Sequence, residues 1–180
     1  MRRPDLFAIA AISGLALAGA MAADARSETK APRTAKAMMK NAAGADVGRV
    51  DLISVSDGVL LKVALKGLPP GGHAFHIHAV GKCEPPFASA GGHLNPEGKK
   101  HGLMAAGGPH AGDMPNLDVP ASGELKIEVL NTEVSLDEGD ADSLLKPGGT
   151  ALVIHAGSDD YKSDPAGNAG ARIACGVIVP

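Results

Sequence analysis

The sequence predicts an all-β domain, an antiparallel sandwich or flattened barrel of about eight short strands. Two observations predict it: apolar and polar residues alternate over several short runs, and turn-forming residues separate those runs. Glycine and proline contribute 24 and 13 of the 180 residues, which favours many turns and long irregular loops. After the N-terminal segment, no stretch has a convincing amphipathic-helix pattern.

The alternation is clearest at 124–129, where Leu125, Ile127 and Val129 are separated by charged residues, and it recurs at 59–66. The runs 56–58, 69–72 and 122–123 are typical of turns. The acidic stretch 132–146 fits either a turn of helix or a connecting loop. The remaining expected strands are 34–40, 47–56, 73–79, 115–119, 150–155 and 172–178.

Two long segments, 80–114 and 156–171, contain no strand pattern. Loops of this length in a compact domain are usually functional. We therefore expect the chemistry of the protein to lie in these two loops.

The N-terminus has the features of a targeting segment. Arg2 and Arg3 precede an apolar, alanine-rich run at 6–21, and residues 20–22 form a small-x-small cleavage motif. We expect a signal peptide at 1–22, a flexible leader at 23–33 and a single domain at 34–180. The alternative is an uncleaved membrane anchor, although the apolar run is shorter than the roughly 20 residues of a spanning helix.

Charge and cysteine content narrow the class of protein. The formal net charge of −3 argues against general nucleic-acid binding, which needs a basic surface. Cys83 and Cys175 are the only two cysteines, and an even count in an exported protein favours a disulfide over two free buried thiols. We expect a periplasmic or secreted protein that is not stably inserted in a membrane.

All histidines lie in or beside the two long loops. His76 and His78 are two residues apart on an expected strand, so both side chains emerge from one face of the sheet. Such a pair is either half of a metal site or two surface histidines. The seven histidines are His73, His76, His78, His93, His101, His110 and His155.

A second group lies within the first loop. His93, His101, His110 and Asp113 follow one another in a glycine-rich segment, and three imidazoles with one carboxylate suffice for a closed tetrahedral zinc site. The alternative is a mobile histidine-rich loop. His155 ends an apolar run, where a lone histidine is more often structural than a ligand.

Four motifs occur in order along residues 34–180: HAFHIH at 73–78, AGGHLNP at 90–96, HAGD at 110–113 and GARIACGVI at 170–178. In these motifs and their spacing the chain resembles the copper,zinc superoxide dismutase family, of the bacterial secreted or periplasmic type. The resemblance implies an eight-stranded Greek-key sandwich or flattened barrel with two long functional loops.

The resemblance also implies two metal sites joined by one histidine. His93 would bridge copper and zinc as an imidazolate. Asp159 would connect His76, on the copper side, to His101, on the zinc side. The implied copper ligands are His76, His78, His93 and His155, and the implied zinc ligands are His93, His101, His110 and Asp113.

Further roles follow from the same resemblance. Arg172 would guide the anionic substrate beside copper, Cys83 and Cys175 would form the intrasubunit disulfide, and His73 would point away from the metals. The implied reaction converts superoxide to dioxygen and hydrogen peroxide, with copper cycling between oxidation states and zinc structural. On reduction, His93 would release copper and take up a proton. A homodimer is left open.

One difference from the family pattern and two alternative functions have to be weighed against this hypothesis. Lys162 is the only lysine at 156–171, so attraction of the anion is in doubt unless Lys99 and Lys100 contribute. A non-enzymatic copper- and zinc-binding module of the same fold would be expected to lack a copper ligand or Arg172, yet all are present. A zinc hydrolase needs an open zinc position and a nearby general base, whereas the four-residue zinc set is closed.

Overall fold

The computed structural model describes residues 31–180. The expected signal peptide at 1–22 and residues 23–30 of the expected leader lie outside the described residues. Arg33, the last residue of that leader, forms an ion pair with Asp137, with 2.9 Å between Arg33 Nε and Asp137 Oδ1. Within 31–180, no helix is long and apolar enough to cross a membrane.

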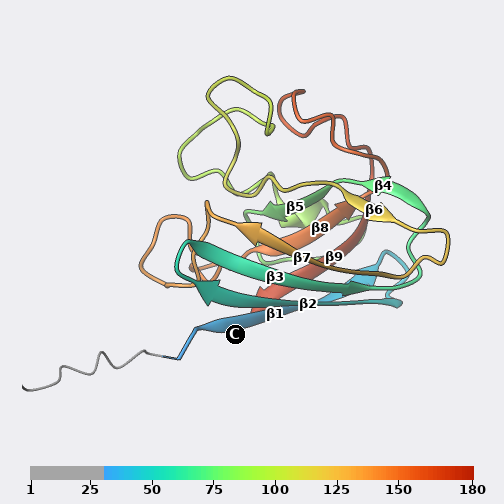
Figure 1. Cartoon of the computed structure of the whole chain (residues 1–180), viewed down its shortest axis with the longest axis horizontal. Helices are drawn as coiled ribbons and strands as arrows, with labels where there is room; N and C mark the ends of the chain where they lie inside the picture. Colours follow the sequence, from blue (N-terminus) through green and yellow to red (C-terminus); the bar gives the residue numbers. More distant parts are fainter. Residues whose placement is uncertain (1–30) are drawn as a thin grey trace, which may run out of the picture. The chain divides into compact units, whose positions relative to one another are not determined.

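The fold is all-β, as predicted. Seven strands form one antiparallel sheet in the order β5-β8-β9-β1-β2-β3-β7, and β4 pairs with β6. The sheet curls around its core, and β9 returns beside β1, which gives the Greek-key order β9-β1-β2-β3 (Figure 1). The strands are β1 (Thr34–Asn41), β2 (Asp46–Val55), β3 (Gly58–Leu65), β4 (Gly71–His73), β5 (Phe75–His78), β6 (Leu117–Val119), β7 (Leu125–Asn131), β8 (Ala151–His155) and β9 (Arg172–Val179).

The described residues contain nine strands rather than eight, because the strand expected at 73–79 is divided at Ala74. The Ala74 amide donates to Gly157 O at 2.8 Å, and the His155 amide donates to Ala74 O at 2.9 Å. At this residue the chain leaves its pairing with β6 and joins β8. A short 3₁₀ helix, η1 (Ala88–Ala90), was not expected, and residues 132–146 form a loop rather than a turn of helix.

The core is built mainly from aliphatic side chains. Along β1 and β3, buried and exposed positions alternate, as expected for strands with one face toward the core. The largest fully buried side chains in this core are Met39, Leu52, Leu61, Phe75, Ile77, Leu94, Met114, Leu117, Leu136, Leu144 and Leu152. Each contributes on the order of 1.5–3 kcal/mol through its removal from water.

Strands β5 and β8 are buried on both faces. Phe75 and Ile77 of β5 belong to the core, so His76 and His78 lie on the opposite face. Behind β8, Val153 packs in a second small apolar cluster with Phe87 and Cys175. The two histidines are therefore inside the protein, although they lie outside the main core.

The edge of the large sheet at β5 is covered by the first long loop. The Ile77 amide donates to Gly112 O at 2.9 Å, and Ile77 O accepts from the Leu94 amide at 2.8 Å. His76 and Asp113 form one isolated bridge, and His78 and His93 form another. Segments around residues 93 and 112 thus use the hydrogen-bonding groups of β5 that face away from β8.

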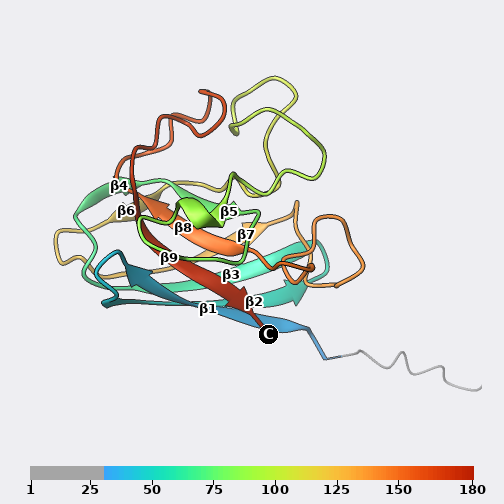
Figure 2. The same cartoon turned by 180° about the vertical axis from the view of Figure 1, so that it is seen from behind.

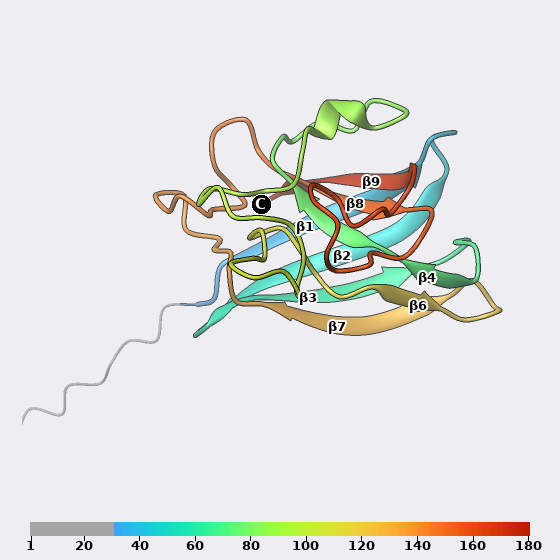
Figure 3. The ribbon, with the colours of Figure 1, turned by 90° about the horizontal axis from the view of Figure 1, so that it is seen from above.

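Both long loops project on the same side of the sheet, as opposite views show (Figures 1 and 2), although they leave opposite ends of the antiparallel pair β5 and β8. Seen from above, the second long loop lies over β8 (Figure 3). They contact each other directly: the His101 amide donates to Asp164 Oδ1 at 3.0 Å, and the Met104 amide donates to Tyr161 O at 3.0 Å. The two segments expected to be functional therefore form one surface.

The predicted disulfide is confirmed: Cys83 is bonded to Cys175, and the two positions are 92 residues apart in sequence. It fastens the start of the first long loop to β9. Arg172 fastens the same loop a second time, because its guanidinium donates to Phe87 O and Gly91 O, both at 2.6 Å. The segment between Cys83 and Gly91 is therefore held at both ends.

The double variant Cys83→Ser/Cys175→Ser should lose roughly 2–5 kcal/mol of stability, because a long loop is no longer closed in the unfolded chain. Denaturant unfolding of the metal-free variant beside the metal-free parent measures this loss. Parent treated with a reductant should unfold at the same denaturant concentration as the variant. Equal midpoints for the variant and the oxidised parent would contradict the expectation.

Candidate metal centre

Four histidines direct one ring nitrogen each into a common buried space. Two come from β5, one from the end of β8 and one from the first long loop, and their donor atoms lie within 4.8 Å of one another. None of these nitrogens has a hydrogen-bond partner in the structure, although all are buried. The four atoms are His76 Nδ1, His78 Nε2, His93 Nε2 and His155 Nε2.

The other nitrogen of each ring explains why these four nitrogens have no hydrogen-bond partner. His78 Nδ1 lies 2.9 Å from Gly91 O, and His155 Nδ1 lies 3.2 Å from Gly170 O. A neutral imidazole has one N–H, so donation to a carbonyl leaves a lone pair on the other nitrogen. Buried polar atoms without a partner are rare in proteins. A group of such lone pairs fits a copper ion, which imidazole ligands suit.

Burial keeps the imidazoles of His76, His78 and His155 neutral. It lowers the pKa of His78 to about 2 and that of His155 to about 4, and it also lowers the pKa of His76. Neighbouring histidines and Arg172 add to the effect on His78 and His155. At neutral pH these side chains are therefore in the state that binds metal.

A second group has the size of a tetrahedral zinc site. Asp113 Oδ1 lies 2.8 Å from His93 Nδ1, 3.1 Å from His101 Nδ1 and 3.4 Å from His110 Nδ1. His93 Nδ1 and His110 Nδ1 are 3.4 Å apart. Ligands placed about 2.0–2.1 Å from zinc in a tetrahedron lie roughly 3.3 Å from one another. The donor set and its dimensions thus fit zinc.

Hydrogen bonds keep the Asp113 carboxyl group ionised. Burial alone would raise its pKa, but hydrogen bonds from His93 and from the Gly102 amide outweigh burial and lower the pKa to about 2. Its Oδ2 accepts from the Gly102 amide at 2.9 Å and from the His110 amide at 3.0 Å. Oδ1 therefore remains directed at the three ring nitrogens.

His93 belongs to both groups. Its Nε2 faces the first group and its Nδ1 faces the second, and its side chain is 3% exposed. The His93 ring centroid lies 4.1 Å from that of His76 and 5.5 Å from that of His110. One imidazole can thus serve two ions, one at each nitrogen.

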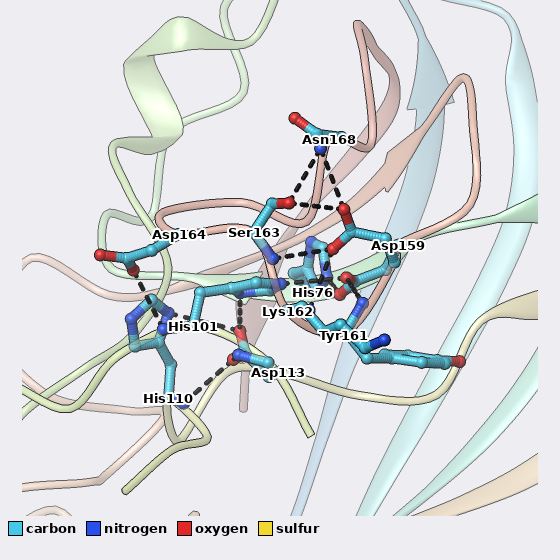
Figure 4. A network of polar contacts seen from close by, with 12 residues as sticks. His76, His101, His110, Asp113, Asp159, Tyr161, Lys162, Ser163, Asp164 and Asn168 are labelled. Atoms are coloured by element: carbon cyan, nitrogen blue, oxygen red, sulfur yellow. Dashed lines mark hydrogen bonds and ion pairs between the residues drawn. The ribbon is translucent and has the colours of Figure 1, made fainter. Parts of the chain in front are cut away.

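Asp159 connects the two groups from the other side (Figure 4). Its Oδ2 lies 2.8 Å from His76 Nε2, and its Oδ1 lies 3.0 Å from His101 Nε2. Burial opposes its charge, but the hydrogen bonds from His76 and His101 prevail and hold its pKa well below the usual range. A carboxylate in this position fixes the tautomer and orientation of both rings.

A cleft of about 390 Å³ leads to His78, His93 and His155. Arg172 lies on its wall, and Lys99 and Asp164 also line it. Lys99 Nζ is 3.2 Å from Glu97 and 3.5 Å from Glu133. Two carboxylates therefore offset the charge of Lys99, and Arg172 is the cation of the cleft lining without a carboxylate partner among the described residues.

The structure brings together every residue assigned to the metal centre from the sequence: six histidines, Asp113, Asp159 and Arg172. His73 lies apart, as expected, with Nδ1 2.7 Å from His155 O and Nε2 2.8 Å from Pro69 O. Asn116 and Tyr161 also contact Asp159, and neither was predicted from the sequence. No motif marks them, since their role depends on contacts between distant segments.

Comparison with known proteins agrees with this geometry. The profile of the family described as copper/zinc superoxide dismutase (SODC) matches residues 47–178. "Superoxide dismutase [Cu-Zn] 2" of Aquifex aeolicus is 58% identical over 146 residues, which cover 80% of this chain and 85% of the relative.

Two solved structures are also similar. A SOD-like protein from Bacillus subtilis has a TM-score of 0.77 and 38% identity, covering 79% of this chain and 96% of that one. The Cu/Zn superoxide dismutase from Brucella abortus has a TM-score of 0.67 and 31% identity, covering 81% of this chain and 99% of that one. Fold, buried histidine groups and similarity agree, and the chain belongs to the copper/zinc superoxide dismutase family.

Proposed function

We propose that the protein converts superoxide to dioxygen and hydrogen peroxide with a copper ion in the first histidine group and a zinc ion in the second. The observation that carries the proposal is the shared position of His93 between four unpartnered imidazole nitrogens and a tetrahedral donor set. Bound copper would supply one-electron redox chemistry, and zinc, which is not redox-active, would supply charge and a fixed geometry.

The histidines have distinct tasks in this proposal. His76, His78 and His155 would hold copper through nitrogens whose orientation is set by hydrogen bonds at the opposite side of each ring. His93 would offer Nε2 to the copper group and Nδ1 to the zinc group, and its Nε2 is the atom at which this residue would carry a proton. Peroxide formation consumes two protons for each pair of superoxide ions, and Nε2 of His93 delivers one of them.

His101, His110 and Asp113 complete the zinc site in this proposal. Their contacts with His93 Nδ1 and with the backbone of the first long loop keep the shared imidazole in place. Asp159 aligns His76 and His101 at the same time. We therefore assign zinc a structural role.

Arg172 attracts and aligns the anion. Its guanidinium uses two N–H bonds to hold Phe87 O and Gly91 O, so its position on the cleft wall is fixed while other N–H groups remain available. Burial lowers the pKa of Arg172, but an arginine keeps its charge in a protein. Because the whole chain is acidic, attraction of superoxide depends on this local charge.

The second candidate is a metal-binding module of the same fold without catalytic activity. One similar structure is described as that of a SOD-like protein from Bacillus subtilis. The complete copper donor set and the Arg172 beside it favour the enzyme. A carrier would need the donors but would gain nothing from a fixed cation in the cleft.

We further propose that the protein works in the periplasm or outside the cell as an antioxidant defence. The Cys83–Cys175 disulfide supports this location, because disulfides persist in oxidising compartments. Residues 1–22 would be removed as a signal peptide, residues 23–33 would form a leader, and residues 34–180 would be the catalytic domain.

The variant His155→Ala should consume superoxide more than about 100-fold more slowly than the parent when both are supplied with copper and zinc, because a copper ligand is lost. Activity and copper content are measured on the same samples. Lys126→Ala, which changes an exposed residue of β7 that belongs to neither donor group, should match the parent. If the parent carries both metals and is inactive, the metal-binding module becomes the better account.

Stability of the metal-free protein should fall as the pH drops from 7 to 5. The unfolded chain protonates His78 and His155 near pH 6.5, whereas the folded chain resists protonation until about pH 2 and about pH 4. The unfolded state then binds more protons, so stability is lost on acidification, by about 2 kcal/mol per histidine at pH 5.

Denaturant unfolding of the metal-free protein at several pH values measures this slope. The variant His155→Gln lacks one of the two groups and should show a shallower slope over the same range. Equal stability of the metal-free parent at pH 7 and pH 5 would contradict the assignment of buried neutral histidines.

A further inference from the structure

Asp159 is held by a closed ring of hydrogen bonds that includes Asn116 and Tyr161. Asn116 Nδ2 donates to Asp159 O at 2.9 Å, and Asn116 Oδ1 accepts from the Asp159 amide at 2.8 Å. The backbone amide of Asn116 donates to the Tyr161 hydroxyl at 2.8 Å. The backbone amide of Tyr161 donates to Asp159 Oδ1 at 2.6 Å. The carboxylate between the two metal groups is therefore fixed through both its backbone and its side chain.

Tyr161 also supports the loop that carries the zinc group. Tyr161 O accepts from the Met104 amide at 3.0 Å. Gly102 has a φ of +108°, and a Cβ on it would collide with Tyr161 O, so the two backbones are in direct contact. The amide of the same Gly102 donates to Asp113 Oδ2. Tyr161 thus contacts Asp159 directly. It also contacts Gly102, whose backbone amide orients Asp113.

The backbone of Tyr161 is in the left-handed region, with a φ of +62°. A tyrosine does not favour this conformation on its own, so surrounding contacts must hold it there. Its hydroxyl is the side-chain atom that does so, through the Asn116 amide. Without that hydroxyl, both Asp159 and the Gly102 contact would lose a fixed support.

We propose that Tyr161 is a positioning residue of the metal centre: its hydroxyl fixes Asp159 and the zinc loop together, and so determines how firmly zinc is held. Tyr161 touches neither metal group and acts through Asp159 and Gly102. The inference rests on the proposed zinc site. It adds a residue that none of the four sequence motifs contains.

The chain offers its own spectroscopic reporter for this role. Tyr161 is its only tyrosine, and the chain has no tryptophan. A tyrosine circular dichroism signal therefore reports the surroundings of Tyr161 alone. Zinc binding to the parent should change this signal, because the ring of hydrogen bonds tightens when Asp159 and His101 are fixed.

The test compares the parent with Tyr161→Phe, which keeps the aromatic ring of the side chain and removes its hydroxyl. The matched control is Ser163→Ala, which removes a hydrogen bond to Asp160 Oδ2 in the same loop but no contact with Asp159. Proteins loaded with copper and zinc are exposed to a chelator, and zinc release is timed. Cobalt(II) is then placed in the zinc site, and its visible absorption spectrum reports ligand geometry.

We expect Tyr161→Phe to release zinc about 10-fold faster than the parent and to alter the cobalt spectrum, as loss of an outer support of a metal ligand does. Ser163→Ala should match the parent in both measurements. Equal release by the parent and Tyr161→Phe would overturn the inference, as would equally fast release by both variants. A parent that binds no zinc would instead overturn the proposed function on which the inference rests.

Discussion

The metal centre depends on the single N–H of a neutral imidazole. Because His78, His155 and His76 each have a fixed acceptor for that N–H, the lone pair on the opposite nitrogen has a defined direction. Burial enforces the neutral state by lowering the pKa of each ring. Backbone carbonyls and one carboxylate thus organise the ligands before any ion arrives.

The acceptors come from segments that the fold must bring together. Gly91 and Gly170 lie in the two long loops, and Asp159 is reached from β5 and from the first loop at once. A curled sheet that has both loops on one side satisfies this requirement (Figures 1 and 2). The disulfide and Arg172 then hold the loop that carries Gly91 against β9.

Much of this organisation could be predicted from residue patterns. Alternation at 59–66 and 124–129 reports burial on one face, and it located β3 and β7 closely. The two long loops and the disulfide were also anticipated. The division at Ala74 could not be, because it results from hydrogen bonds to Gly157 and His155, about 80 residues away in the chain.

In the site, too, some residues could be predicted from local sequence patterns and others could not. Histidines and Asp113 stand out by residue type and spacing, and the structure groups them. Asn116 and Tyr161 carry no such signal, since an asparagine and a tyrosine have many ordinary uses. Their part in holding Asp159 follows from the meeting of three segments, which local patterns do not encode.

The pairing of the first long loop with β5 has a consequence for self-association of the protein. An edge strand with free amides and carbonyls is a template on which another chain can add a strand. In this protein, segments around Leu94 and Gly112 occupy that edge, and those segments also carry His93, His110 and Asp113. Any change that displaces this loop would therefore expose the β5 edge, so the order of the loop and the protection of that edge depend on the same few peptide groups.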